Sequence, residues 1–347
     1  MIVGIDLGTT NSLVGVYQDG QVKLIPNAFG EYLTPSVVAL DDNDQIIVGK
    51  IAKERLVTHP DRTLSQFKRF MGTKHELVLG NRTYKAEELS SFVIRKLVDD
   101  AETYLGEKVE EVIVSVPAYF NDAQRYATKL AGQFAGVKIE RIINEPSAAA
   151  LAKRSMSNQE DQSFVVVDFG GGTLDISVVE LFDNVVEIVS IAGDNRLGGE
   201  DFTAAIAEEF LASNQLSKKS ISREFYSKIL VQAEKAKLNL NINEEVQMLV
   251  MDQEKEYSLD LTYQRFYELC QPLLARLKYV LDRALMDARY SYVSSDNFVL
   301  VGGTSKLRLV QDFLSYCIDQ AVQLTDDPDK MIAKGCALLA GIKGRQG

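Results

Sequence analysis

The sequence contains no tryptophan, two histidines and three cysteines among its 347 residues. With only His59 and His75 available, a histidine-based transition-metal site has almost no ligands. The cysteines, Cys270, Cys317 and Cys336, lie far apart in apolar segments. This spacing predicts buried thiols and disfavours a disulfide framework or a zinc cluster.

Long apolar runs and basic runs are also absent. No stretch approaches the roughly 20 apolar residues that span a bilayer, and residues 1–7 lead directly into an apolar strand without a basic leader. Acidic residues outnumber basic ones 49 to 38, which gives a net charge of −11. We therefore expect a cytoplasmic protein that binds neither membranes nor nucleic acid.

The residues that are present predict a folded protein with more than one lobe. Apolar residues make up 46% and charged residues 25% of the chain, which is close to ordinary globular usage. At roughly 150 residues per domain, the length predicts about two lobes with full cores.

An internal repeat supports two related lobes. Residues 2–17 and 164–180 share one plan: an apolar strand, Asp, a glycine turn with Thr, and a second apolar strand. In the first half, the strand 109–120 leads into a helix at 121–136, and in the second half 296–314 again runs from strand through turn to helix. The pattern predicts an α/β fold with a similar sheet in each lobe.

The helix at 121–136 has clear end signals. Asn121 can cap its start and Gly136 its end. Its apolar residues share one helical face: Ala123, Tyr126, Ala127, Leu130 and Phe134.

Two regions depart from the repeated plan and are predicted to be insertions. We place them at about residues 36–86 in the first lobe (1–162) and about 200–270 in the second (163–327). The second insertion is predicted to contain a long helix at 221–240 and a β segment at 247–261. A last helix, from Pro328 to about Lys343, is expected to return to the first lobe, with proline in its first turn.

Three glycine turns follow apolar strands and suit the binding of phosphate. Phosphates require backbone N–H groups that approach closely, which residues without a Cβ allow. One such turn alone is usually an ordinary tight turn, but three in a duplicated fold favour a nucleotide site. The turns are Gly8-Thr9-Thr10, Gly170-Gly171-Gly172-Thr173 and Gly302-Gly303-Thr304.

Two aspartates precede these turns. Asp6 and Asp168 each lie where an apolar strand ends, and an unpaired carboxylate there is costly. Mg²⁺ uses one or two carboxylates together with phosphate oxygens, so the pair fits a Mg–ATP site. The alternative is that each aspartate only caps its own turn.

At this point the motifs resemble a known family. The blocks are similar, in the same order, to those of the seventy-kilodalton heat-shock chaperones of the DnaK type, over residues 2–342. They are IDLGTTNS (5–12), SVPAYFNDAQR (115–125), IINEPSAAA (142–150), VDFGGGTLDIS (167–177), GDNRLGGEDF (193–202), EKAKLNL (234–240) and VLVGGTSKL (299–307). The segments PNAFGEYLTPS and SQFKRFMGT are most similar to the bacterial branch called HscC.

The resemblance implies an actin-like ATPase fold, with two ribonuclease-H-like lobes around a central nucleotide cleft. ATP or ADP would be bound with Mg²⁺ by the glycine turns, with Thr9, Thr10 and Asn11 on the first lobe. Asp6 and Asp168 would act through the waters of the metal. Lys68 would neutralise charge on the transferring phosphoryl group, and Glu145 would orient the attacking water.

Other positions carry implied roles or plainer alternatives. Thr173 would lie near the γ-phosphate and, with Asp175, could bind K⁺, while Pro117 and Arg125 would relay the nucleotide state. Without the motif, Lys68 would be a solvated lysine, and Glu145 an acid favouring a helix start.

The adenosine side of the resemblance departs from the family's pattern. The matching positions are Gly199, Glu234, Lys237, Leu238, Asn241, Lys306 and Asp329. Many members carry Arg or an aliphatic residue at the position of Leu238, and Ser at the position of Asn241. Lys306 replaces an arginine that would stack on adenine, and lysine stacks less well.

The implied function is a slow ATPase whose nucleotide state controls lobe closure and, through it, a client-binding domain. That domain is not in this sequence, which ends at GRQG without the aliphatic linker, so we expect no client-peptide binding by this chain alone. A J-domain co-chaperone is the expected partner. The slightly short 200–270 region disfavours the usual nucleotide-exchange factor, and a monomer is expected.

Two other functions stay open for this fold. A small-molecule kinase would need an acceptor pocket and a base aimed at a hydroxyl, of which the sequence gives no sign. A filament-forming protein would sediment with Mg–ATP.

Overall fold

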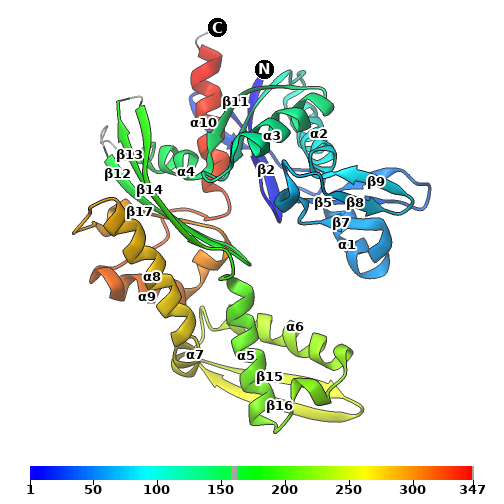
Figure 1. Cartoon of the computed structure of the whole chain (residues 1–347), viewed down its shortest axis with the longest axis vertical. Coiled ribbons are helices and arrows are strands. Elements are labelled where there is room, and N and C mark those ends of the chain that lie inside the picture. The colour runs from blue at the N-terminus through cyan, green and yellow to red at the C-terminus, as the bar shows by residue number, and fades with distance from the viewer. Residues whose placement is uncertain (158–161, 184, 346–347) are drawn as a thin grey trace. The chain divides into compact units, whose positions relative to one another are not determined.

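The computed structural model describes residues 1–157, 162–183 and 185–345. The chain divides into two compact units, one of Met1–Gln159 with Lys330–Gly347 and one of Glu160–Asp329 (Figure 1). The last two residues of the GRQG end, 346–347, lie outside the described residues.

The first unit is built on a mixed six-stranded sheet. The strand order is β11-β10-β1-β2-β3, with β4 paired to β2. The strands of this sheet are β1 (Ile2–Leu7), β2 (Asn11–Gln18), β3 (Gln21–Leu24), β4 (Thr34–Pro35), β10 (Glu111–Val116) and β11 (Lys138–Asn144). The strands β1, β10 and β11 run parallel, whereas β1, β2 and β3 are antiparallel.

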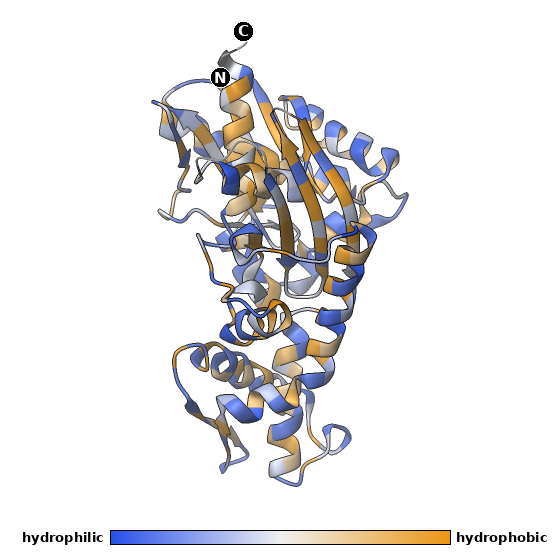
Figure 2. Ribbon diagram, turned by 90° about the vertical axis from the view of Figure 1, so that its left-hand side faces the viewer, coloured by the Kyte–Doolittle hydropathy of each residue, from blue (hydrophilic) through white to orange (hydrophobic). Residues whose placement is uncertain are grey.

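Successive side chains of each strand point to opposite faces of this sheet, and helices cover both faces. On one face, a Cβ on Gly4 would lie 2.4 Å from the backbone of Cys336 on α10, so no side chain fits there, and a Cβ on Gly15 would lie 3.2 Å from Ala337 Cβ, a tight contact. On the other face, Val3 and Ile5 share a core with residues of α2 and α3. These helices are α2 (Ala86–Leu105), α3 (Asp122–Phe134), α4 (Glu145–Arg154) and the largely apolar α10 (Met331–Arg345) (Figure 2).

Between β4 and α2 the chain forms smaller elements of its own. A three-stranded sheet, β6-β5-β7, packs against α1, and β8 and β9 form a hairpin. Their bounds are β5 (Val37–Leu40), β6 (Ile46–Val48), α1 (Lys50–Thr58), β7 (Thr63–Ser65), β8 (Glu76–Leu79) and β9 (Arg82–Lys85), with short 3₁₀ helices at Pro60–Arg62 (η1) and Phe67–Phe70 (η2).

The second unit repeats the plan of the first. Its sheet has the order β14-β13-β12-β17, in which β12 and β13 form an antiparallel hairpin and β17 runs parallel to β12. In the first unit, β1, β2 and β10 are related in the same way. The bounds are β12 (Gln162–Phe169), β13 (Leu174–Phe182), β14 (Val185–Asp194) and β17 (Phe298–Val301). The predicted duplication of an α/β plan is confirmed.

Helices and a hairpin complete the second unit. The hairpin β15–β16 packs beside α5 and α6, and α8 packs on β13 and β14 (Figure 1). The elements are α5 (Gly199–Ser213), η3 (Lys218–Ser220), α6 (Arg223–Asn239), β15 (Glu245–Asp252), β16 (Lys255–Thr262), α7 (Tyr263–Leu269), α8 (Gln271–Asp287), η4 (Ser295–Asn297), η5 (Gly303–Lys306) and α9 (Arg308–Ile318). The helix and β segment predicted here are both present.

The predicted start of the last helix needs correction. The last helix begins at Met331, not at Pro328. Pro328 lies in a preceding turn, where its carbonyl accepts a hydrogen bond from Gly302 N–H at 3.3 Å and Asp329 N–H is bonded to Asp327 Oδ1. These bonds hold the segment in a turn and delay the helix.

The interpretation of the cysteines is confirmed in part. All three thiols are free; Cys270 and Cys336 are buried, whereas Cys317 is half-buried. Among the residues that the structure describes, no helix has the length and apolar character needed to cross a bilayer.

Candidate functional site

The β1–β2 turn of the first unit is closed by glycine geometry. A Cβ on Gly8 would lie 2.0 Å from the carbonyl oxygen of Asn11, so no other residue fits without shifting the turn. Gly8 N–H donates to Ser12 Oγ at 3.2 Å and is therefore used within the protein. Thr9 and Thr10 are exposed and Asn11 is half-buried, which leaves these three positions open to a ligand.

Lys68 and Glu145 form an ion pair beside this turn. Lys68 Nζ lies 2.8 Å from Glu145 Oε1 and donates to the carbonyl of Leu7 at 2.6 Å. The side chains are only 9% and 15% exposed. The solvated-lysine alternative for Lys68 is therefore wrong.

The local structure explains why these two side chains meet. Gln66, in the left-handed region at φ 54°, directly precedes the short helix η2, in which Phe67 and Lys68 are buried. Glu145 is the first residue of α4 and is followed by Pro146, so it also has the helix-start position of the plainer alternative. The helix-start description of Glu145 is confirmed, the ion pair with Lys68 is an additional fact, and the role of Glu145 toward the attacking water stays a prediction.

Asp6 lies at the end of β1 with 7% of its surface exposed. Its Oδ1 accepts a hydrogen bond from Ser115 Oγ, on β10, at 3.2 Å. The thiol of Cys336, on α10, is fully buried nearby. Its pKa is raised well above the usual value by burial, and then by the charges of Asp6 and Glu145.

Arg125 connects the segment after β10 to the residue before Glu145. Its guanidinium donates to Phe120 O at 2.9 Å and to Asn144 Oδ1 at 2.7 Å. Phe120 N–H in turn donates to Pro117 O at 3.1 Å. Pro117 and Arg125 therefore belong to one hydrogen-bonded segment that ends at α4.

In the second unit, two glycine segments lie against each other. Gly199 N–H donates to Gly170 O at 3.0 Å, and Glu200 N–H donates to Gly171 O at 2.9 Å. A Cβ on Gly198 would lie 2.3 Å from the backbone of Gly171, so this contact requires glycine. Gly172 has no neighbouring atom within 4 Å of its Cβ position and is open to a ligand.

The side chains of Thr304 and Lys237 hold these glycine segments in place. Thr304 Oγ1 donates to Gly170 O at 2.8 Å, which ties the third glycine turn to the second. Lys237 is buried, and its Nζ donates to Gly199 O at 3.1 Å while pairing with Glu234 at 2.8 Å. Burial opposes ionisation of Glu234, but hydrogen bonds from Lys237 and Thr203 prevail and lower its pKa.

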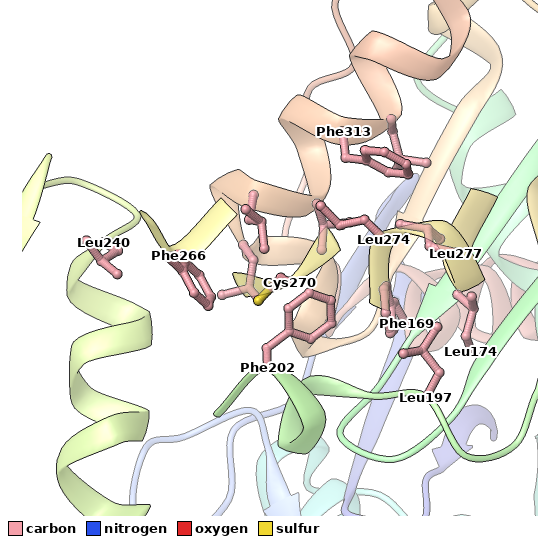
Figure 3. Close-up of a cluster of buried hydrophobic side chains, with 14 of the residues drawn as sticks. Phe169, Leu174, Leu197, Phe202, Leu240, Phe266, Cys270, Leu274, Leu277 and Phe313 are labelled. Atoms are coloured by element: carbon pink, nitrogen blue, oxygen red, sulfur yellow. The ribbon is translucent and has the colours of Figure 1, made fainter. Parts of the chain in front are cut away.

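A core of aromatic and aliphatic side chains lies behind these turns (Figure 3). Phe169 ends β12 directly before Gly170, and Phe202 lies in the first turn of α5. Their rings meet edge to face with centroids 5.9 Å apart. Phe169, directly before Gly170, and Phe202, three residues after Gly199, thus anchor the two glycine segments in this core.

Two carboxylates flank the β12–β13 turn. Asp168 and Asp175 are partners in the strand register, and Asp168 also lies beside Val301 of β17. Gly302, at φ 87°, has its Cβ position 3.1 Å from Asp168 Oδ1, and that of Gly193 is 2.7 Å from Asp175 Oδ1. A larger residue at Gly193 would displace the Asp175 carboxylate, and one at Gly302 would collide first with the carbonyl oxygen of Phe169, 2.4 Å from its Cβ position. Thr173 is exposed in the same turn.

The positions expected on the adenosine side are only partly together. Lys306 pairs with Asp329 at 2.6 Å and with Asp327 at 3.3 Å. Burial acts to lower the pKa of Lys306, but these carboxylates raise it overall, so it stays protonated. Asn241 Oδ1 accepts from Arg308 N–H at 3.0 Å, and Leu238 is half-exposed.

Several residues of these sites were not predicted from the sequence. Ser12, Ser36, Ser115 and Thr203 act through hydrogen bonds to residues far away in the chain, and Gly198 through a contact with Gly171. Four of these residues stand in blocks quoted for the resemblance, although the blocks do not reveal their partners; they are Ser12, Ser36, Ser115 and Gly198.

The described residues contain no group of three or more His, Cys, Asp or Glu side chains that could hold a metal ion.

Comparison with known proteins gives a consistent result. The profile of the family described as Hsp70 protein matches residues 2–346. The chaperone protein DnaK of Thermotoga neapolitana is 38% identical over an alignment that covers 100% of this chain and 61% of that relative. The chain therefore spans about three fifths of the length of this relative.

Proposed function

Because this chain belongs to the Hsp70 family, whose members are ATPases with the actin-like fold, we propose that it binds ATP with Mg²⁺ and hydrolyses it to ADP and phosphate. The observation that carries the proposal is the buried Lys68–Glu145 pair beside the Gly8 turn. This arrangement places a cation and a carboxylate next to a turn with exposed threonines.

Each unit by itself offers groups that would hold the triphosphate and its metal. In the first unit, Thr9, Thr10 and Asn11 would hold phosphate oxygens, with Asp6 bonding a water of the metal. In the second unit, Gly170–Gly172 and Thr173 would hold phosphate and Asp168 a water. Mg²⁺, when bound, supplies positive charge that neutralises the phosphate oxygens.

Hydrolysis then requires a positioned water and charge compensation. Glu145 would accept a hydrogen bond from the water that attacks the γ-phosphorus, and would orient it in line with the leaving oxygen. The bond between the γ-phosphorus and the bridging oxygen breaks, and ADP leaves. Lys68 would stabilise the charge that develops on the phosphoryl oxygens.

The decisive experiment is phosphate release from ATP without any added acceptor. The proposal expects slow, continuous release that depends on Mg²⁺. A strict small-molecule kinase would be nearly silent under these conditions, and a filament-forming protein would sediment with Mg–ATP. The proposal would be refuted if the sample neither bound ATP nor released phosphate from it.

The metal role of Asp168 has its own test. Asp168→Asn keeps the shape and removes the charge, so we expect the Mg²⁺ concentration for half-maximal turnover to rise about tenfold, the equivalent of one lost carboxylate interaction of about 1.4 kcal/mol. Asp252→Asn, in the distant hairpin β15, is the matched control and should leave the Mg²⁺ dependence unchanged. An unchanged Mg²⁺ dependence in Asp168→Asn would remove Asp168 from the metal site.

The finer parts of the proposal follow the family. We place the lobe boundary near 162/163, with insertions at about 36–86 and 200–270. The nucleotide state would control a client-binding domain through lobe closure. Glu234 and Lys237 would contact the ribose. Asp175 could hold K⁺, a J-domain protein would be a partner, and the HscC branch, cytoplasmic location and monomeric state remain predictions.

A further inference from the structure

Three hydrogen bonds form a closed ring at the first glycine turn. Gly8 N–H donates to Ser12 Oγ at 3.2 Å, and Ser36 Oγ donates to the carbonyl of Gly8 at 2.8 Å. The two serine oxygens are 2.8 Å apart. Each hydroxyl has one proton, and that of Ser36 is used on Gly8, so Ser12 must be the donor to Ser36. Every donor in the ring is then used once.

The ring is shielded from water. Ser12 is 0% and Ser36 3% exposed. A buried hydroxyl that loses its partner costs about 1–3 kcal/mol, and bonded groups in series strengthen one another. The three groups therefore hold the two peptide planes on either side of Gly8 as a unit.

Ser36 also forms a hydrogen bond to the other side of the same turn. Its backbone N–H donates to the carbonyl of Thr10 at 2.9 Å. One residue thus bonds to Gly8 through its side chain and to Thr10 through its backbone. The carbonyl of Gly8 shares a peptide plane with the N–H of Thr9, and the carbonyl of Thr10 shares one with the N–H of Asn11, so the bonds from Ser36 orient these two amides.

The same residue begins the path to Lys68. Ser36 is followed directly by β5, in which Val37 is the register partner of Ser65 on β7. Gln66 and the helix η2 come next and carry Lys68, whose Nζ donates to Leu7 O at 2.6 Å. Ser36 thus connects the glycine turn, through β5 and β7, to the segment of Lys68, and Lys68 bonds back to Leu7, the residue before the turn.

We propose that Ser36 is a positioning residue for phosphate binding: through its bonds to Gly8 and Thr10 it sets the amides of the turn to fit a polyphosphate, and it couples the turn to the segment that carries Lys68. This inference rests on the proposed nucleotide function. It differs from a simple stabilising role because it concerns the phosphates of the ligand and not its base or sugar.

The test compares ligands with and without phosphate. Calorimetric titration with Mg–ATP, Mg–ADP and adenosine is carried out on the full chain, on Ser36→Ala and on Ser12→Ala. We expect Ser36→Ala to lose about tenfold or more in ATP and ADP affinity, while its adenosine affinity stays within about twofold. Ser91→Ala is the matched control, because Ser91 is a buried serine whose hydroxyl donates within its own helix, to Glu88 O.

A double variant tests whether the serines act as one ring. Replacing either serine by alanine opens the ring. The double variant Ser12→Ala/Ser36→Ala should therefore lose no more ATP affinity than the single variant that binds ATP less tightly. Losses that simply multiply would overturn the ring. If Ser36→Ala does not fold, Ser12→Ala decides, and it must show the same loss for ATP with adenosine unchanged.

The outcomes separate this inference from the proposed function. A wild-type chain that binds no ATP refutes both. A wild-type chain that binds ATP, with a Ser36→Ala variant that binds ATP equally well or loses ATP and adenosine alike, refutes only the positioning role. Lower melting temperature alone, with affinities unchanged, would assign Ser36 a structural role.

Discussion

At the scale of single residues, the Lys68–Glu145 pair joins positions 77 apart in the sequence. Glu145→Gln keeps the shape and a hydrogen-bond partner for Lys68 but removes the charge that can orient water. We expect turnover to fall by about 10²-fold or more with ATP affinity largely intact, as is typical of a water-positioning or base residue. Single-turnover phosphate release and ATP titration measure the two quantities separately.

A nearby carboxylate supplies the control for this variant. Glu140, on β11, pairs with Lys138 at 3.2 Å on the surface, so Glu140→Gln should leave turnover unchanged. If Glu145→Gln turned over ATP at the wild-type rate, Glu145 would have no part in the reaction.

The cysteines give a prediction about pH. Burial raises the pKa of Cys317 to about 11 and that of Cys270 to about 12. At pH 8 only about 10⁻³ of the Cys317 thiol would be ionised, against about a quarter for a free cysteine of pKa ~8.5. We expect native alkylation to be at least 10²-fold slower than in urea and to rise about tenfold per pH unit.

Cys317 should react before the other two thiols because it is the least buried. Peptide mapping after iodoacetamide treatment at pH 8, 9 and 10 measures the order. Since these folded pKa values lie above the unfolded ones, the folded state keeps its protons longer, and the thiols' contribution to stability is lost as pH rises above about 9. Rapid labelling of Cys317 at pH 8 would contradict the assigned pKa.

Which residues could be predicted depends on how far away their partners lie. Asp6, the Gly8 turn and Asp168 are visible in the sequence because strand, carboxylate and glycine are adjacent. Ser36 and Cys336 have no such signal, since they act on a turn and a carboxylate reached only through the folded sheet. Lys68 could be predicted only from the resemblance, because the inward turn at Gln66 has no sequence pattern.

At the scale of elements, α3 shows how a periodic pattern can predict a helix and mislead about its buried face. Asn121 does cap the helix, accepting from Gln124 N–H at 2.9 Å. However, Tyr126 and Phe134 are 64% and 55% exposed. The buried side consists of Ala127, Thr128, Ala131 and Gly132. Small residues are needed there because a Cβ on Gly132 would lie 2.4 Å from Ile139.

The contact between α10 and α4 also depends on a glycine. A Cβ on Gly335 would lie 1.9 Å from the carbonyl oxygen of Ala148. We expect Gly335→Ala to destabilise the first unit by about 1–3 kcal/mol through overpacking, although alanine is the better helix former. Urea unfolding monitored by circular dichroism measures the change.

Gly344→Ala is the matched control on the same helix. The Cβ position of Gly344 has no neighbour within 4 Å, so alanine should be neutral or stabilising by up to ~1 kcal/mol. A Gly335→Ala protein as stable as wild type would mean that the two helices can separate at no cost.

At the scale of the whole molecule, each unit has a core of its own. The repeated hairpin and parallel strand could be predicted from the echo of 2–17 in 164–180, because both carry the same order of strand, aspartate and turn. The start of α10 could not, because it depends on the bond between Gly302 and Pro328, which lie apart in sequence.

Two cores allow two separate unfolding transitions, and a ligand held by groups from both units must stabilise both. At a Mg–ATP concentration of 100 Kd the native state gains about 2.7 kcal/mol, which corresponds to roughly 5–10 °C for units of this size. We expect calorimetry to show the whole unfolding profile shifting upward, and amide exchange to slow in β1 and β12 alike, the interior strands of the two sheets. Adenosine at the same concentration should have a smaller effect, since it lacks the phosphates that the glycine turns would hold. Protection confined to β1 or to β12 would mean that one unit alone binds the nucleotide, and the assignment of Asp6 and Asp168 to a shared metal would then be wrong.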